Sequence, residues 1–327
     1  MDKLRVAVVG VGNLGRHHTR IYAGLPDVEL AGVVDIDERT ALKIAWKFGT
    51  TAYRSLREVP GRLDAVSVVV PTQAHRPVAL EALGLGAHVL LEKPIALDMS
   101  EANEIITAAH AKNLVLQIGH IERFNPAIVA LRKILTRVGF IEVHRLAPYM
   151  REGTEVGVVL DLMIHDIDII LNIVASRLVE IHAVGIPVLS ASEDIANARL
   201  RFENGCIANV TASRISFEKV RKIRVFQSNA YLSLDYQNQE GMIYRKDGGR
   251  IVREKLPLEK DEPLKLELAS FIECVRASRQ PLVPGEHGRQ ALRVASEITR
   301  LCRENPLYHD AIEEQRKSTP IDLGKLM

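Results

Sequence analysis

Residues 4–35 read LRVAVVGVGNLGRHHTRIYAGLPDVELAGVVD. Residues 4–9 and 28–34 are apolar runs of strand length, and residues 14–25 between them carry apolar side chains at helical spacing. Strands that are apolar on both faces are typical of a parallel sheet that helices cover on both sides. The stretch therefore predicts the first strand–helix–strand unit of a doubly wound α/β fold.

The turn between this first strand and the helix contains three glycines. Gly10, Gly12 and Gly15 form the pattern GxGxxG. The first glycine permits a tight turn, the second lets a pyrophosphate approach the backbone, and the third lets the helix pack closely on the strand. Free N–H groups at the start of the helix then bind the phosphates. With a strand before it and a helix after it, the turn predicts a dinucleotide-binding Rossmann domain.

Asp35 stands at the end of the second strand. A carboxylate in that place accepts hydrogen bonds from the adenosine ribose hydroxyls and repels the 2′-phosphate of NADP. The two residues that follow, Ile36 and Asp37, are not basic. We therefore predict that the cofactor is NAD.

The rest of the chain divides into two patterns. Up to residue 120, apolar strand-like runs continue to alternate with helical segments; the runs are 65–70, 88–91 and 114–118, and the helical segments are 78–85 and 102–111. After residue 120 strand-like segments dominate, and several alternate apolar with polar residues, which is expected of an antiparallel sheet with one buried face. These are residues 196–202, 206–213, 223–227 and 231–236, with helical segments at 126–138, 159–174, 263–278 and 288–302.

These patterns predict two domains. We expect residues 1–120 to form an NAD-binding Rossmann domain with a parallel sheet. We expect residues 121–327 to form an α+β domain with a large mixed or antiparallel sheet, which binds the substrate and mediates homo-oligomerisation as a dimer or tetramer. The last helices are expected to pack back on the first domain.

Composition excludes several classes of protein. A net charge of +2 with interleaved acidic and basic residues argues against a nucleic-acid-binding surface. Three cysteines far apart in the sequence indicate neither a disulfide framework nor a zinc site. The sequence contains neither a membrane span of about 18 apolar residues nor the cleavage region of a secretory signal. We therefore expect a cytoplasmic protein whose ligands are small molecules.

Two loops follow strands at the edge where open parallel sheets bind ligands. Glu92-Lys93-Pro94 follows the run at 88–91, and Pro71-Thr72-Gln73-Ala74-His75 follows the run at 65–70. A lysine before proline, taken alone, is more often part of a surface loop. If the loops are functional, they meet over the nicotinamide.

Asp161, His165 and Asp168 lie on one face of the predicted helix at 159–174, because they are spaced i, i+4 and i+7. The spacing by itself equally fits a solvent-exposed polar face. A metal site formed by these three residues is a further alternative, but no second ligand cluster supports it. We expect no metal.

Taken together, the motifs resemble the glucose–fructose oxidoreductase, inositol dehydrogenase and MocA (Gfo/Idh/MocA) family. They are GxGxxG, the acidic residue ending the second strand, EKP at 92–94 and DxxxH at 161–165. The resemblance extends to GEHG at 285–288 near the end of the chain. The segments GHIERFNP at 119–126 and DLMIHDID at 161–168 are similar to the branch that contains the UDP-N-acetylglucosamine 3-dehydrogenases.

The resemblance implies a site. The catalytic residues would be Lys93, His165 and Asp161; NAD would contact Gly10, Gly12, Asn13, Leu14, Gly15, Asp35, Pro71, Thr72, His75, Glu92 and Lys93; and the substrate would contact Lys93, Arg123, Asn125, Asp161 and His165. Oxidation of a secondary alcohol needs a base at the hydroxyl while hydride leaves for the nicotinamide. His165 suits that role at neutral pH, Asp161 can orient its ring, and the Lys93 ammonium can stabilise alkoxide charge.

The resemblance leaves alternatives open for the substrate. The first expectation is a UDP-sugar, best C3 of UDP-N-acetylglucosamine, whose 3-keto product a partner aminotransferase could aminate. Candidate cations for its diphosphate are Arg123, Arg214, Lys219 and Arg221. The alternatives are a dehydrogenase of a free sugar or cyclitol, and an NAD-binding sensor without catalysis, although a sensor would be expected to have lost Lys93, Asp161 or His165.

Overall fold

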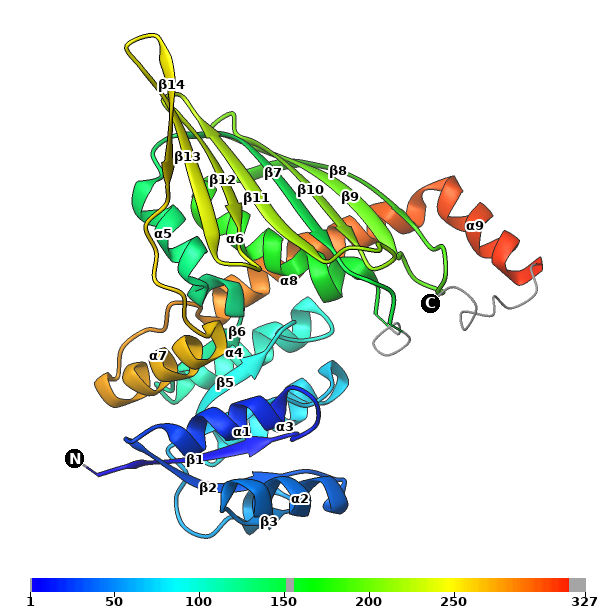
Figure 1. Ribbon diagram of the computed structural model, residues 1–327. Helices are drawn as coiled ribbons and strands as arrows, with labels where there is room; N and C mark the ends of the chain where they lie inside the picture. Colours follow the sequence, from blue (N-terminus) through cyan, green and yellow to red (C-terminus); the bar gives the residue numbers. More distant parts are fainter. Residues whose placement is uncertain (1, 151–155, 318–327) are drawn as a thin grey trace. The chain divides into compact units, whose positions relative to one another are not determined.

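The computed structural model describes residues 2–150 and 156–317 (Figure 1). The chain folds into two compact units. The first comprises the chain up to Asn125 together with Asp261–Leu292, and the second comprises the described residues of Pro126–Lys260 and those from Arg293 onward. None of the helices in the described part of the chain is both long enough and apolar enough to span a membrane.

The first unit contains a six-stranded parallel sheet with the order β3-β2-β1-β4-β5-β6. The strands are β1 (Leu4–Val9), β2 (Val28–Val34), β3 (Ala52–Tyr53), β4 (Ala65–Val68), β5 (His88–Glu92) and β6 (Leu116–Gly119). The helices are α1 (Gly15–Gly24), α2 (Glu38–Phe48), α3 (His75–Gly84), α4 (Met99–Ala111) and α7 (Pro263–Ala277), with 3₁₀ turns η1 (Leu56–Glu58), η2 (Thr72–Ala74) and η3 (Ile121–Phe124). The order reverses beside β1, which is where such sheets bind dinucleotides.

Local sequence signals set the limits of α2, which follows β2. Asp37 is its N-cap and accepts a hydrogen bond from the Arg39 main-chain N–H, and the helix ends at Gly49, whose φ of 67° is adopted most readily by glycine. Ala41, Ile44 and Ala45 are its buried residues. The three share the apolar face that the sequence spacing predicts.

The first unit runs past the boundary predicted at residue 120, because η3 packs against α7. Leu264, Leu268 and Phe271 of α7 join the apolar core that contains Tyr22 of α1 and Leu90 of β5. The start of the next helix, α8 (Gly285–Glu304), also belongs to this unit. There a side-chain carbon at Gly288 would lie 2.8 Å from Ile118 of β6, so glycine is required for close packing.

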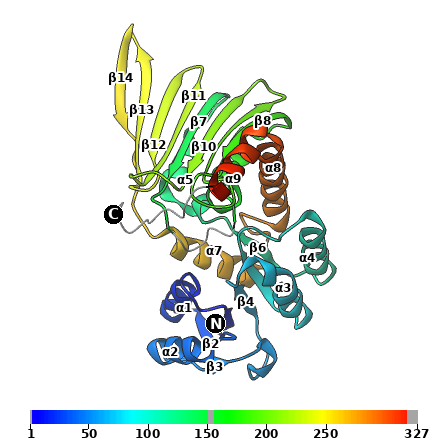
Figure 2. The same ribbon diagram turned by 90° about the vertical axis from the view of Figure 1, so that its right-hand side faces the viewer.

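The second unit contains an eight-stranded sheet with the order β14-β13-β12-β11-β7-β10-β9-β8, in which only β7 and β10 are parallel (Figure 2). The strands are β7 (Val138–Leu146), β8 (Leu178–Ile186), β9 (Ile195–Phe202), β10 (Ile207–Ser213), β11 (Val220–Gln227), β12 (Ala230–Asp235), β13 (Glu240–Asp247) and β14 (Arg250–Lys255). The other helical segments are α5 (Pro126–Ile134), the π-turn η4 (Val159–Met163), α6 (Ile164–Val174) and α9 (Pro306–Lys317). Both predicted sheets, the parallel one and the mixed one, are confirmed.

One helix boundary was predicted wrongly in the second unit. The helical segment expected at 126–138 ends at Ile134, and Val138 begins β7. The alternation of Ile141 and Val143 with polar residues is the strand signal, since both are fully buried on the face that α6 covers. β7 is therefore a central strand of the sheet that carries α6.

Candidate active site

The glycine turn after β1 has two glycines that the fold requires and one that it does not. A side-chain carbon at Gly10, whose φ is +82°, would lie 2.5 Å from the Val69 carbonyl oxygen, and one at Gly15 would lie 1.8 Å from the Gly10 carbonyl oxygen. At Gly12 nothing lies within 4 Å of such a carbon. The packing therefore explains Gly10 and Gly15, whereas Gly12 leaves open backbone surface of the kind that a pyrophosphate approaches.

Asp35 joins the end of β2 to this turn. Its Oδ2 accepts a hydrogen bond from the Val11 main-chain N–H at 2.8 Å, and its Oδ1 accepts one from the Asp37 N–H at 2.9 Å. The carboxylate is half-buried and is thus held beside the glycines. Asn13 and Leu14, which are exposed, continue the turn into α1. These residues fit the adenosine and pyrophosphate parts of a dinucleotide.

Glu92 follows β5 and is turned into the protein. Its Oε1 lies 3.2 Å from Nε2 of His18 on α1, and its Oε2 accepts a hydrogen bond from the Lys93 main-chain N–H at 3.2 Å. Burial alone would raise the pKa of Glu92, but the hydrogen bond from His18 and the charges of His18 and Lys93 bring that pKa below its ordinary value. Glu92 is therefore a buried carboxylate next to Lys93. The sequence predicted Glu92 only as a cofactor-binding residue.

His75 connects the two loops that were predicted to meet. Its Nδ1 lies 2.8 Å from the Pro94 carbonyl oxygen and its Nε2 lies 2.9 Å from the Val70 carbonyl oxygen. Burial lowers the pKa of His75, although the nearby carbonyl oxygens of Pro94 and Val70 oppose that shift. The ring thus ties the Lys93–Pro94 turn to the segment that contains Pro71 and Thr72, and its contact with the cofactor stays a prediction.

In the second unit, Asp161 and His165 are one turn apart on the helix formed by η4 and α6. Asp161 lies in the π-turn and its N–H donates to the Gly157 carbonyl oxygen at 3.1 Å. π-Turns inside helices are frequent at functional sites. Asp161 and His165 are half-buried and Asp168 is buried, so this is not a solvated polar face.

A buried ion pair anchors α6 to the sheet. Asp166 accepts hydrogen bonds from Nε of Arg145 at 2.7 Å and from the hydroxyl of Tyr236, and all three side chains are buried. Arg145 is on β7 and Tyr236 follows β12. Asp166, the residue after His165, is therefore held by β7 and by the residue that follows β12, which orients the helix that carries Asp161 and His165. Sequence reasoning missed this pair, although Arg145 continues the buried alternation of Ile141 and Val143.

Two residues predicted to bind the substrate lie in the 3₁₀ segment after β6. Arg123 is only 1% exposed and its Nη2 donates to the Leu282 carbonyl oxygen at 3.3 Å. The amide of Asn125 is also buried and donates to Oε2 of Glu122 at 3.1 Å. Both side chains hold the polypeptide in place within the first unit, and their contact with substrate remains a prediction.

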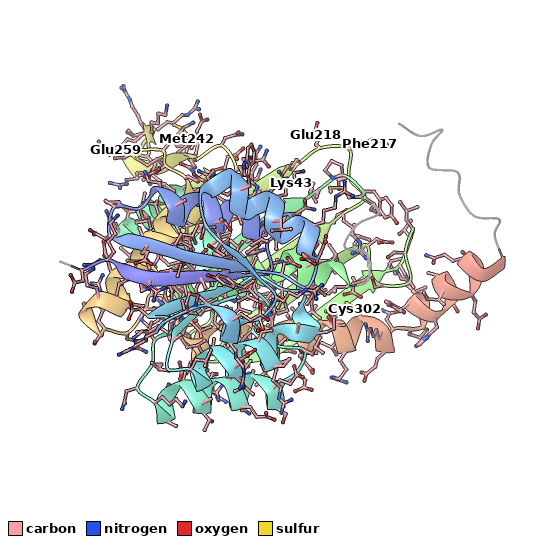
Figure 3. The ribbon with its side chains drawn as sticks, turned by 90° about the horizontal axis from the view of Figure 1, so that it is seen from below. Lys43, Phe217, Glu218, Met242, Glu259 and Cys302 are labelled. Atoms are coloured by element: carbon pink, nitrogen blue, oxygen red, sulfur yellow. The ribbon has the colours of Figure 1, made fainter. Side chains whose placement is uncertain are left out.

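The candidate cations for a diphosphate differ in how deeply they are buried. Arg214 is buried and pairs with Asp194 at 2.8 Å, while its Nη1 donates to the Val156 carbonyl oxygen. Its expected role at a diphosphate is therefore not favoured, because its charge is already offset. In the loop between β10 and β11, Lys219 is exposed and Phe217 is 98% exposed (Figure 3). Arg221, at the start of β11, is half-buried.

Comparison with known proteins agrees with these features. Residues 4–120 match the model of an oxidoreductase family with an NAD-binding Rossmann fold, and residues 135–233 match the GFO/IDH/MocA C-terminal domain. A UDP-N-acetylglucosamine 3-dehydrogenase from Acidithiobacillus ferrooxidans is 36% identical over 91% of this chain and 97% of its own length. A myo-inositol 2-dehydrogenase from Thermotoga maritima is 26% identical over 88% of this chain and 93% of its own.

The same relationship appears in three dimensions. A crystal form of the Acidithiobacillus ferrooxidans enzyme superposes with a TM-score of 0.87 and covers 92% of this chain and 98% of its own. Family models cover the parallel sheet and strands β7 to β11 of the mixed sheet, and the identity to that relative extends over almost the whole chain. The chain therefore belongs to the Gfo/Idh/MocA family of oxidoreductases, with an NAD(P)-binding Rossmann domain.

Proposed function

We propose that the protein is a nucleotide-sugar dehydrogenase that uses NAD to oxidise C3 of UDP-N-acetylglucosamine to the 3-keto sugar. The observation that carries this proposal is the 36% identity over 91% of the chain to a UDP-N-acetylglucosamine 3-dehydrogenase. The presence of Lys93, Asp161 and His165 supports catalysis rather than ligand sensing.

In this proposal His165 accepts the proton of the substrate hydroxyl. Bound NAD supplies the carbon that takes up the hydride. Asp161, one helical turn before His165, orients the imidazole and stabilises its protonated form. Lys93 donates a charge-assisted hydrogen bond to the same hydroxyl oxygen and so stabilises the negative charge that develops there.

The preference for NAD over NADP rests on Asp35. Its carboxylate is held at the glycine turn by the N–H groups of Val11 and Asp37, so it cannot easily turn away from a ligand. A 2′-phosphate placed against it meets a like charge, whereas the free ribose hydroxyls of NAD meet a hydrogen-bond acceptor.

For the diphosphate we propose Lys219 and Arg221 as the recognising cations. Lys219 is exposed, and Arg221 lies two residues further along at the start of β11. Arginine and lysine bind phosphate oxygens through charge-assisted hydrogen bonds. The neighbouring Phe217 offers an exposed aromatic ring of the kind on which a base can stack.

We also propose a homo-oligomer formed through the open face of the second unit's sheet. A row of neighbouring aromatic rings crosses four of its strands: Phe140, Phe226, Tyr231 and Tyr244, with centroids 5.5, 4.7 and 5.1 Å apart in turn. Between them lie polar side chains such as Ser233. A face that mixes aromatic and polar groups is typical of subunit interfaces.

A substrate screen tests the proposal. NADH formation is followed by absorbance with UDP-N-acetylglucosamine, with free N-acetylglucosamine and with myo-inositol, each over a range of concentrations. We expect kcat/KM to be highest for the UDP-sugar, with a 3-keto product by NMR that an aminotransferase can aminate. Higher kcat/KM for myo-inositol would contradict the proposal and favour a cyclitol dehydrogenase, the second candidate, which the 26% identical myo-inositol 2-dehydrogenase supports.

A further inference from the structure

A chain of four buried polar side chains lies beneath the Lys93–Pro94 turn in the first unit. Glu92 ends β5, Ser67 belongs to β4, and His18 and Tyr22 lie one turn apart on α1. All four are buried. A buried polar group is costly unless it is hydrogen-bonded, so such a chain persists only when its members satisfy one another.

The distances join the four side chains in one hydrogen-bonded chain. The Tyr22 hydroxyl lies 2.9 Å from Ser67 Oγ, which lies 3.3 Å from His18 Nδ1. His18 Nε2 lies 3.2 Å from Glu92 Oε1. Because a carboxylate only accepts, His18 donates to Glu92 from Nε2, whereas the links from Tyr22 to Ser67 and from Ser67 to His18 can run in either direction. Glu92 is therefore satisfied as a carboxylate by the Nε2–H group of His18.

The carboxyl group has no freedom to move away from this position. Its second oxygen accepts the Lys93 main-chain N–H. On the β6 side, a side-chain carbon at Gly119 would lie only 2.8 Å from the Glu92 carboxyl carbon. The pocket is thus closely fitted to a glutamate and brings its negative charge next to Lys93.

We propose that Glu92 and His18 are positioning residues for Lys93: His18 holds Glu92 as a carboxylate, and the carboxylate fixes the Lys93 main chain and offsets its ammonium charge. The inference rests on the proposed role of Lys93 at the substrate oxygen. The charge that Lys93 brings to the substrate then depends on Glu92, which does not itself touch the substrate.

The other ionisable groups around Glu92 and His18 do not neutralise the carboxylate charge of Glu92. Tyr22 faces it from α1 and His75 from the start of α3, while Glu267 on α7 faces Tyr22. Burial raises the pKa of Tyr22 far above its ordinary value, so Tyr22 is uncharged near neutral pH, and burial lowers the pKa of His75. The charge of Lys93 lowers the pKa of Glu92 and so favours its carboxylate form.

The direct test measures the reactivity of the Lys93 amine without substrate. Glu92→Gln keeps the size of the side chain and an acceptor for His18, but it removes the charge. At about pH 8.5 we expect Lys93 to react about 10-fold faster with an amine-specific acylating reagent in this variant, as quantified by mass spectrometry of the peptide, because an ammonium without its counter-charge loses its proton more readily. His17→Gln, at an exposed position on the same helix, should leave the rate unchanged.

Turnover as a function of pH provides the second readout. In Glu92→Gln and His18→Leu, the fall in kcat at high pH should move about one unit lower. His18→Gln, whose amide can still donate to Glu92, should keep the wild-type profile. Lys93 labelling within twofold of wild type in Glu92→Gln would overturn the inference, even if His18→Leu fails to fold. If labelling changes as expected but the wild type oxidises no UDP-sugar, the proposed function fails and the positioning pair stands.

Discussion

The carboxylate of Asp35 accepts the main-chain N–H of Val11 at 2.8 Å, so the acidic residue that ends β2 is bonded directly to the glycine turn after β1. Asp35→Ser removes the charge that opposes a 2′-phosphate. We expect the ratio of NADPH to NADH affinity to rise by about 10-fold or more, since one like-charge contact is worth on the order of 1 kcal/mol or more. Fluorescence titration with both reduced cofactors measures this ratio. Wild-type protein that binds NADPH as tightly as NADH would contradict the assignment.

The buried pair of Arg145 and Asp166 predicts a large loss of stability when one partner is removed. Arg145→Met leaves the Asp166 carboxylate buried without its cation, and we expect the free energy of unfolding to fall by about 3–5 kcal/mol. Arg177→Met is the control, because Arg177 pairs with Glu203 at an exposed site of the same unit, outside the row of aromatic rings. That variant should lose far less stability in urea unfolding, because exposed ion pairs contribute little. Equal losses in the two variants would show that the buried pair does not anchor α6.

Burial of His75 predicts a pH dependence of stability in the weakly acidic range. Its pKa is lowered in the folded protein from the ordinary 6.5, so below pH 6.5 the unfolded chain binds a proton that the folded protein does not. The free energy of unfolding should therefore fall as the pH drops below 6.5, by at most about 1.4 kcal/mol per pH unit for this one group. His75→Gln should remove that part of the slope, whereas His182→Gln, at an exposed position, should not. Identical slopes in wild type and His75→Gln would contradict it.

The aromatic row on the open sheet face predicts an assembly that can be weakened at one position. Phe226 stacks on Tyr231, lies at a tilt to Phe140 and is partly exposed. We expect wild-type protein to be a dimer or tetramer at micromolar concentration by light scattering, and Phe226→Glu to shift it towards the monomer. A charged residue there leaves the fold intact but places an unpaired charge in the interface. A monomeric wild type would remove the basis for this proposal.

Features encoded within a short stretch of sequence were predicted well. The strand, the GxGxxG turn, the helix and Asp35 lie within 35 residues, and each has a local signature in periodicity or in a required backbone conformation. The spacing of Asp161 and His165 is likewise a property of one helix. Their exposure is not, because only the packing of α6 on β7 and β10 decides that the face is half-buried rather than solvated.

Features that depend on distant residues were missed. The His18–Glu92 pair joins α1 to β5, and the Arg145–Asp166 pair joins β7 to α6. Neither pair leaves a periodic pattern in the sequence from which it could be predicted. Arg214 was grouped with the diphosphate candidates because a free and a paired arginine look the same in sequence, whereas the fold places Asp194 against it. The predicted helix at 126–138 was too long because the apolar residues of α5 run on into those of β7.

The roles of Lys93 and His165 at a single hydroxyl oxygen are the central claim, and a double-mutant cycle tests them most directly. Lys93→Met and His165→Asn should each lower kcat with UDP-N-acetylglucosamine by about 100-fold or more and leave NAD affinity nearly unchanged. Asp161→Asn should be milder, because it keeps the shape of the side chain and removes only its charge. Since both groups act on one atom, the double mutant should lose far less than the product of the two single effects. Wild-type turnover that survives Lys93→Met and His165→Asn would contradict the mechanism.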